Sequence, residues 1–234
     1  MAARGGLEGL ERAAFEAQPQ LASGGALTVT GTVDAGEISL AVGGAADLAT
    51  LIAAGDIVVL ADTILIDSAT SGGDIDLDSP GDIAIDFADA GGDFLADAGG
   101  AFTGGTVLAN VGSDIIITSV DDLRLDNAQA SGLIQLTSTA GDVLSGDPGS
   151  DSVSGSLDAG SDLLIDAADH IAIVDAQAGN NIELDAAGDV TARDLTAVQD
   201  VIVTAGDDIT FRNLTTQLGD AIFVLGGNLE GTGL

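Results

Sequence analysis

Hydrophobic residues alternate with polar ones in short segments, and these segments return at a fixed spacing along the chain. Residues 61–79 read ADTILIDSATSGGDIDLDS and residues 80–98 read PGDIAIDFADAGGDFLADA, so the two stretches match over 19 residues. Residues 168–186 and 187–205 follow the same register. Apolar residues at i and i+2 lie on one face of a strand. A repeat of this length cannot bury its own apolar face, so the pattern predicts a solenoid.

Each repeat contains two alternating segments, which Gly-Asp or Ala-Gly-Asp corners separate. Because Gly and Asp favour turns, we expect strands of about three to five residues. The first segments supply the apolar pairs Leu27/Val29, Ile64/Ile66, Ile83/Ile85, Leu123/Leu125, Ile171/Ile173, Val190/Ala192 and Ile209/Phe211. The second segments supply Ile38/Leu40, Ile57/Val59, Ile75/Leu77, Ile115/Ile117, Ile134/Leu136, Leu163/Ile165, Ile182/Leu184 and Val201/Val203. Parallel stacking of the coils keeps all these matches in register.

We therefore predict an all-β fold, a right-handed parallel β-helix of about ten coils with about 19 residues each. Residues 23–234 form this repeat domain. Residues 140–167 contain about nine extra residues around Gly146–Ser154, where Pro, Gly and Ser predict a loop that bulges from a corner. The last coil has its apolar alternation at Ile222 and Val224, and little chain follows it.

Residues 1–22 differ from the repeats. Leu7, Leu10, Ala14 and Phe15 are spaced as on one face of a helix, and Pro19 follows them. We expect a short N-terminal helix over about residues 5–17 that caps the first coil, because terminal repeats of solenoids are atypical. No run of apolar residues there has the length of a signal-peptide core, so we expect any export signal to lie elsewhere.

The strong negative charge of the chain excludes some classes of binding partner. The sequence has 38 acidic residues against five Arg, no Lys, and a net charge of −33. Binding of nucleic acid needs a basic face, so it is not expected. No stretch approaches the roughly 18 apolar residues of a membrane span, so membrane insertion is not expected either. The chain has no Cys, and therefore no disulfide framework.

Asp residues recur at the corners of successive coils and are the candidate metal ligands. Parallel stacking would place these carboxylates in rows about 5 Å apart, where they repel one another. Such rows persist if each carboxylate accepts backbone N–H groups in a turn, or if cations such as calcium lie between them. The candidates are Asp56, Asp74, Asp93 and Asp114 before the second segments, and Asp82 and Asp122 before the first segments. No EF-hand pattern accompanies them.

No candidate catalytic group emerges from the sequence. The single histidine, His170, occupies a position of the Asp row, which favours a structural role. Enzymes with a β-helix fold that act on acidic polysaccharides need cationic groups and aromatic rings, and the chain has no Trp or Tyr. Arg193 and Arg212 are one repeat apart, where we expect them to offset the charge of Asp194 and Asp207.

Segments such as Gly73-Asp74-Ile75-Asp76-Leu77, Gly81-Asp82-Ile83-Ala84-Ile85 and Gly188-Asp189-Val190 carry a resemblance to a known family. Over residues 24–226 they resemble the repeats of filamentous haemagglutinin and related two-partner-secreted or autotransported bacterial adhesins. The resemblance implies a right-handed β-helix on a bacterial surface or in a secreted matrix.

We therefore expect a non-catalytic extracellular protein, a segment or subunit of a bacterial surface filament, stalk or adhesin. Its expected partners are further copies of itself, joined head to tail, and ligands on host or matrix surfaces. The alternative is a surface-layer or matrix protein bridged by calcium. A β-helix enzyme acting on polysaccharide is the third interpretation.

Overall fold

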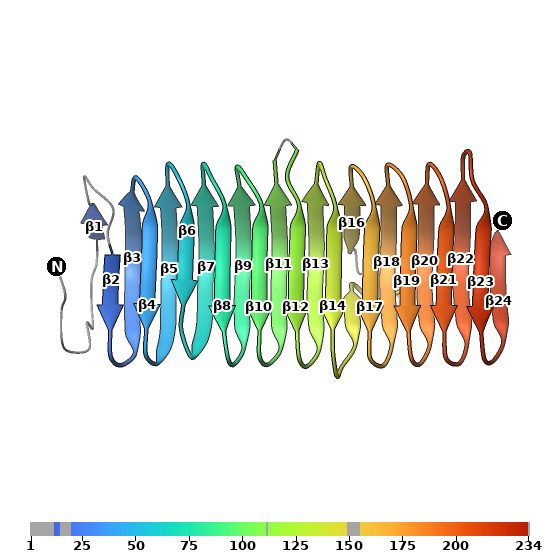
Figure 1. The fold of residues 1–234 in the computed structure, drawn as a ribbon, viewed down its shortest axis with the longest axis horizontal. Coiled ribbons are helices and arrows are strands. Elements are labelled where there is room, and N and C mark those ends of the chain that lie inside the picture. Colours follow the sequence, from blue (N-terminus) through green and yellow to red (C-terminus); the bar gives the residue numbers. More distant parts are fainter. Residues whose placement is uncertain (1–11, 15–19, 111, 149–154, 234) are drawn as a thin grey trace.

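The chain winds into a parallel β-solenoid with its strands perpendicular to the long axis (Figure 1). The computed structural model describes residues 12–14, 20–110, 112–148 and 155–233. Successive strands alternate between two sheets, except in one coil that contributes two consecutive strands to the larger sheet, and neighbours within each sheet are parallel. The smaller sheet has 11 strands, which gives about 11 coils against the predicted ten.

The two sheets are here called sheet A and sheet B. Each coil contributes one strand to each sheet, except that one coil contributes both β15 and β16 to sheet A. Sheet A contains β1 (Arg12–Ala14), β3 (Leu27–Ala35), β5 (Ala45–Ala53), β7 (Thr63–Ser71), β9 (Ile83–Ala90), β11 (Phe102–Ala109), β13 (Leu123–Ala130), β15 (Val143–Ser145), β16 (Ser156–Ala159), β18 (Ile171–Ala178), β20 (Val190–Ala197), β22 (Ile209–Thr216) and β24 (Leu229–Gly233). Sheet B contains β2 (Gln20–Ser23), β4 (Ile38–Val42), β6 (Ile57–Leu60), β8 (Ile75–Ser79), β10 (Phe94–Ala98), β12 (Ile115–Ser119), β14 (Ile134–Ser138), β17 (Leu163–Ala167), β19 (Ile182–Ala186), β21 (Val201–Ala205) and β23 (Ala221–Leu225).

The interior is one stack of small and branched apolar side chains along the solenoid. All the apolar pairs predicted for the two segments are buried, which confirms the predicted register. Ile83, for example, lies beside Ile64 in sheet A and has 1% of its surface exposed. Complete burial of such a side chain contributes roughly 1.5–3 kcal/mol, and here every coil repeats it.

The strands of sheet A are longer than predicted. Strand β9 has eight residues and alternates between buried and outward positions until Asp86 and Phe87, both of which face outward. Alternation and pairing then resume, with Ala88 and Ala90 buried. The two consecutive outward residues mark a bend in the strand. Because the inward residues beyond the bend are often Ala, their hydrophobic signal is weak and the sequence pattern underestimates the strand.

The extra residues of the long coil interrupt sheet A and do not bulge from a Gly-Asp corner. Strand β15 pairs with the first half of β13 and of β18, and β16 pairs with their second halves. The insertion therefore leaves at the bend. Val174 of β18 occupies the first of the two outward positions at that bend, yet it is completely buried. A Cβ placed on Gly146 would meet Val174 Cγ2, so the base of the insertion covers this side chain.

The two ends of the solenoid also differ from prediction. Most of the predicted helix over residues 5–17 lies outside the described residues, and its described part, Arg12–Ala14, is strand β1. Strand β1 pairs with β3, and β2 pairs with β4. In the last coil Ile222 and Val224 face outward and are 44% and 57% exposed, while Phe223 packs against the core. The right-handedness of the solenoid and the domain boundary at residue 22 stay predictions.

Candidate functional site

The Asp row before sheet B joins each coil to the next. Asp56 Oδ1 accepts the backbone N–H of Asp74 at 3.0 Å, and Asp74 Oδ1 accepts that of Asp93 at 2.8 Å. Asp93 Oδ1 accepts the N–H of Asp114 at 2.9 Å, and Asp114 Oδ1 accepts that of Leu133 at 2.7 Å. The row therefore satisfies one backbone N–H per corner, and a charged acceptor strengthens each bond.

The row before sheet A works in the same way. Asp82 Oδ1 accepts the N–H of Ala101 at 3.0 Å, and Asp122 Oδ1 accepts that of Asp142 at 3.0 Å. The carboxylates thus accept backbone N–H groups, as one of the two sequence interpretations predicts. The donor, however, lies one coil away and not in the same turn. A local sequence window contains no sign of a donor 19 residues away, and only the repeat spacing points to it.

The Gly of the Gly-Asp corners makes room for these carboxylates. A Cβ on Gly73 would overlap Asp56 Oδ1, and one on Gly92 would overlap Asp74 Oδ1. The same overlap links Gly100, Gly132, Gly141, Gly219 and Gly227 to Asp82, Asp114, Asp122, Asp200 and Asp208. Each of these Gly residues thus accommodates an Asp of the preceding coil, which explains why the two residue types recur together.

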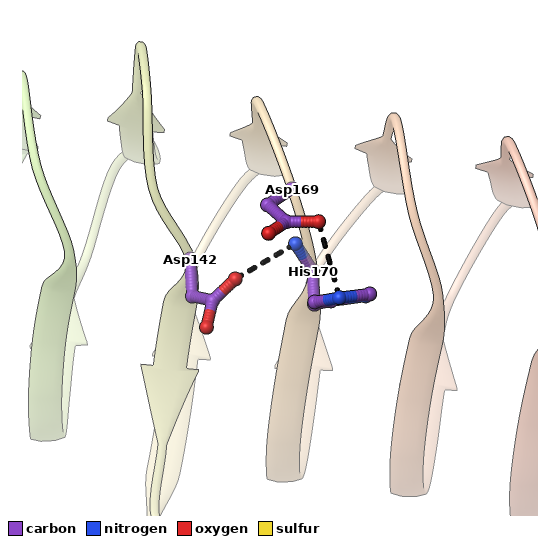
Figure 2. A group of neighbouring side chains, drawn as sticks. All are labelled: Asp142, Asp169 and His170. Atoms are coloured by element: carbon purple, nitrogen blue, oxygen red, sulfur yellow. Dashed lines mark hydrogen bonds and ion pairs between the residues drawn. The ribbon is translucent and has the colours of Figure 1, made fainter.

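His170 takes the place of an Asp in the row before sheet A. Its backbone N–H donates to Asp142 Oδ1 at 3.0 Å, and its Nδ1 accepts the N–H of Asp189 at 2.8 Å. Its Nε2 lies 3.1 Å from Asp169 Oδ1, and Figure 2 shows the ring beside this carboxylate. The imidazole therefore replaces a carboxylate as the acceptor between coils.

Asp142, Asp169 and His170 are also, within the described ranges, the one group of three side chains close enough to share a metal ion. Each offers a ligand atom within 4.8 Å of the others. A neutral imidazole that accepts at Nδ1 carries its proton on Nε2, which then has no lone pair for a metal. The geometry thus serves the row of hydrogen bonds and does not form a ready metal centre. None of the six predicted Asp ligands belongs to this group, and calcium binding by them stays a prediction.

Carboxylates also crowd the outer face of sheet B. The pKa of Asp76 on β8 is raised, first by burial and then by the charges of Asp78 and Asp74. Asp78 lies beside Asp97 of β10, and farther along the sheet Asp166 lies beside Asp185. Charge repulsion on this face is therefore built into the register.

Arg193 forms the best-buried ion pairs of the outer surface among those resolved in the described segments. Its Nη2 lies 2.8 Å from Asp175 Oδ2, its Nε lies 3.1 Å from Asp194 Oδ2, and 14% of the side chain is exposed. The hydrogen bond to Asp175 is the main cause of its raised pKa. Arg212 lies 3.7 Å from Asp194. The predicted charge relief at Asp194 is confirmed, while Asp175, one coil earlier, is the partner that sequence analysis missed.

The hollows described on the surface are open to solvent. One lies on the outer face of sheet B, between Gln135, Leu164, Glu183 and Asp185. In the described part of the chain, no helix is long and apolar enough to cross a membrane.

Comparison with known proteins finds no match for the chain among protein-family models, curated proteins or solved structures. The likeness to filamentous haemagglutinin repeats therefore rests on the residues alone. The fold itself is a parallel β-solenoid.

Proposed function

We propose that the chain is a non-catalytic structural protein of the bacterial exterior, a segment or subunit of a surface filament, stalk or adhesin. The observation that carries this proposal is the continuous stack of coils, in which the insertion splits only one strand of sheet A. One core and two sheets continue along the long axis, and side-chain acceptors join the coils at most of the corners. Such a stack is a stiff rod, and its outer surface offers a long face for contact with a partner.

Self-association head to tail fits the same geometry. Among the described residues, strands β23 and β24 each pair on one side only, with β21 and β22, and no described strand covers their other edges. An open edge and a partly covered apolar layer accept a further coil, either from a second copy or from more of the same chain. Contacts between unlike ends do not close, so repeated docking makes filaments. The net charge of −33 opposes side-by-side packing of rods.

Negative-stain images and sedimentation over a range of protein concentration test this proposal. We expect filaments one rod wide, whose length grows with protein concentration and with moderate salt, because salt screens the repulsion. Strict monomers at high concentration would contradict self-association. Labelling of intact source cells with an antibody tests whether the protein is located outside the cell. Label found only after lysis would contradict an extracellular location.

Calcium bridging is a second candidate, favoured by the crowded carboxylates of β8 and its neighbours. The raised pKa of Asp76 shows that its charged form is disfavoured, and a bound cation would relieve this. If calcium binds the folded state, millimolar calcium should raise Tm more than sodium chloride of equal ionic strength. Equal shifts in the two salts would contradict calcium bridging.

A matched pair of variants locates the effect. Asp76→Asn should reduce the shift caused by calcium. Asp47→Asn should leave it unchanged, because the residues paired directly with Asp47 on the adjoining strands, Thr28 and Leu65, are uncharged.

A further inference from the structure

One junction between coils depends on an imidazole where the neighbouring junctions of the same row depend on carboxylates. Asp142 and Asp189 accept the backbone N–H of the following coil through Oδ1. His170, which lies between them in the row, does so through Nδ1. Carboxylates keep their charge above about pH 5, whereas imidazole is the side chain whose charge ordinarily changes between about pH 5 and pH 8.

We propose that His170 makes the junction between the coil of β18 and the coil of β20 sensitive to pH. In its neutral form the ring accepts the N–H of Asp189 at Nδ1, over 2.8 Å, and its Nε2–H points at Asp169 Oδ1. This tautomer completes the row of hydrogen bonds. In this state the two coils are joined at this corner by the hydrogen bond from the Asp189 N–H to Nδ1.

Protonation gives the ring a second N–H group, at Nδ1, opposite the N–H of Asp189. Two donors then face each other, and the backbone N–H loses its acceptor. Two carboxylates lie beside the ring: Asp169 Oδ1 is 3.1 Å from Nε2, and Asp189 Oδ2 is 3.8 Å from Nδ1. Asp142, in the coil below, is the third charged group at this corner. The imidazolium therefore exchanges a backbone hydrogen bond for pairing with the Asp189 carboxylate.

The ring has little room to make this exchange without moving the backbone. A Cβ on Gly188 would lie 2.6 Å from both Nδ1 and Cε1 of His170, so the ring rests directly on this Gly. A shift of Nδ1 from the Asp189 N–H toward the Asp189 carboxylate must therefore displace either the ring or the backbone at Gly188. We expect the change to be centred on this corner.

The chain supplies its own non-titrating control. In the row before sheet B, Asn181 Oδ1 accepts the N–H of Asp200 at 3.1 Å, and Asn181 Nδ2 donates to Asp162 Oδ1 at 3.0 Å. His170→Asn reproduces this arrangement without a group that titrates near neutrality. His170→Asp restores the carboxylate found in adjacent coils, and it serves if the first variant is unstable.

Amide exchange, followed by NMR at pH 8 and pH 5 and expressed as protection factors, tests the proposal. In the wild-type chain we expect the protection of the Asp189 amide to fall about five- to tenfold at pH 5, the worth of one hydrogen bond. The amides of Asp142 and Asp208, which donate to carboxylates, should keep theirs. Both variants should abolish the change at Asp189. Unchanged protection in the wild type, or an equal fall in both variants, would overturn the proposal.

Discussion

At the scale of single residues, the corners show how two residue types one coil apart depend on each other. Gly92 lies where the carboxylate of Asp74 needs space, and that carboxylate binds the N–H of Asp93. We expect Gly92→Ala to cost about 1–3 kcal/mol of unfolding free energy, because either the carboxylate or the backbone must shift.

A double-mutant cycle separates this contact from a general effect of Ala at a corner. In an Asp74→Ala background the cost of Gly92→Ala should fall, since the overlapping oxygen is gone. Gly36→Ala is the control, because a Cβ there meets nothing within 4 Å. Equal costs of Gly92→Ala in both backgrounds, measured by chemical denaturation, would show that the two residues are independent.

Asp76 gives a prediction about pH. Its pKa is raised in the folded state, so the folded chain binds this proton more tightly than the unfolded chain does. Its contribution therefore favours folding below the pKa of the unfolded state and is lost as pH rises through the folded-state pKa. Asp76→Asn should raise Tm at pH 7, and this gain should disappear toward pH 3. Half a molar salt should shrink the gain at pH 7. A gain that is the same at pH 7 and pH 3 would contradict this account.

At the scale of the strand, the alternation of side chains decides what a substitution costs. Ile182 on β19 is completely buried, while Ile202 on β21 points outward and is partly covered. Ile182→Asp should cost about 3–5 kcal/mol, because it leaves an unpaired charge in an apolar stack. Ile202→Asp should cost about 1 kcal/mol or less. Similar midpoints of denaturation for the two variants would mean that the register of sheet B is wrong.

The same alternation explains which parts of the fold could be predicted from sequence. Ile, Leu and Val at i and i+2 gave a strong signal, so both sheets and their register were predictable. The second halves of the sheet A strands were not, because Ala88 and Ala90 resemble turn residues as much as core. The role of Val174 was equally hidden, since this outward position is buried by the close approach of Gly146 at the base of the insertion. The carboxylates were found as rows, but their acceptor role between coils depends on stacking, which local sequence does not encode.

At the scale of the whole molecule, the coils predict a rod of fixed proportions. Eleven strands of sheet B, spaced about 4.8 Å apart, span about 50 Å. Small-angle scattering of the dilute monomer should give an elongated particle of that order, and circular dichroism should show mainly β structure. A helical content above about a quarter of the chain would contradict the solenoid.

The contact between a corner Gly and the Asp of the coil before it, as at Gly92 and Asp74, constrains how the length of the rod can change. Removing one whole coil brings a Gly-Asp corner onto an equivalent corner, so hydrogen bonds and space still match. Removing half a coil sets sheet A residues against sheet B residues and leaves carboxylates without donors. The length of such a molecule can therefore change only in whole steps of one strand spacing, about 4.8 Å. The distance that it holds between its two ends is set by a count of repeats.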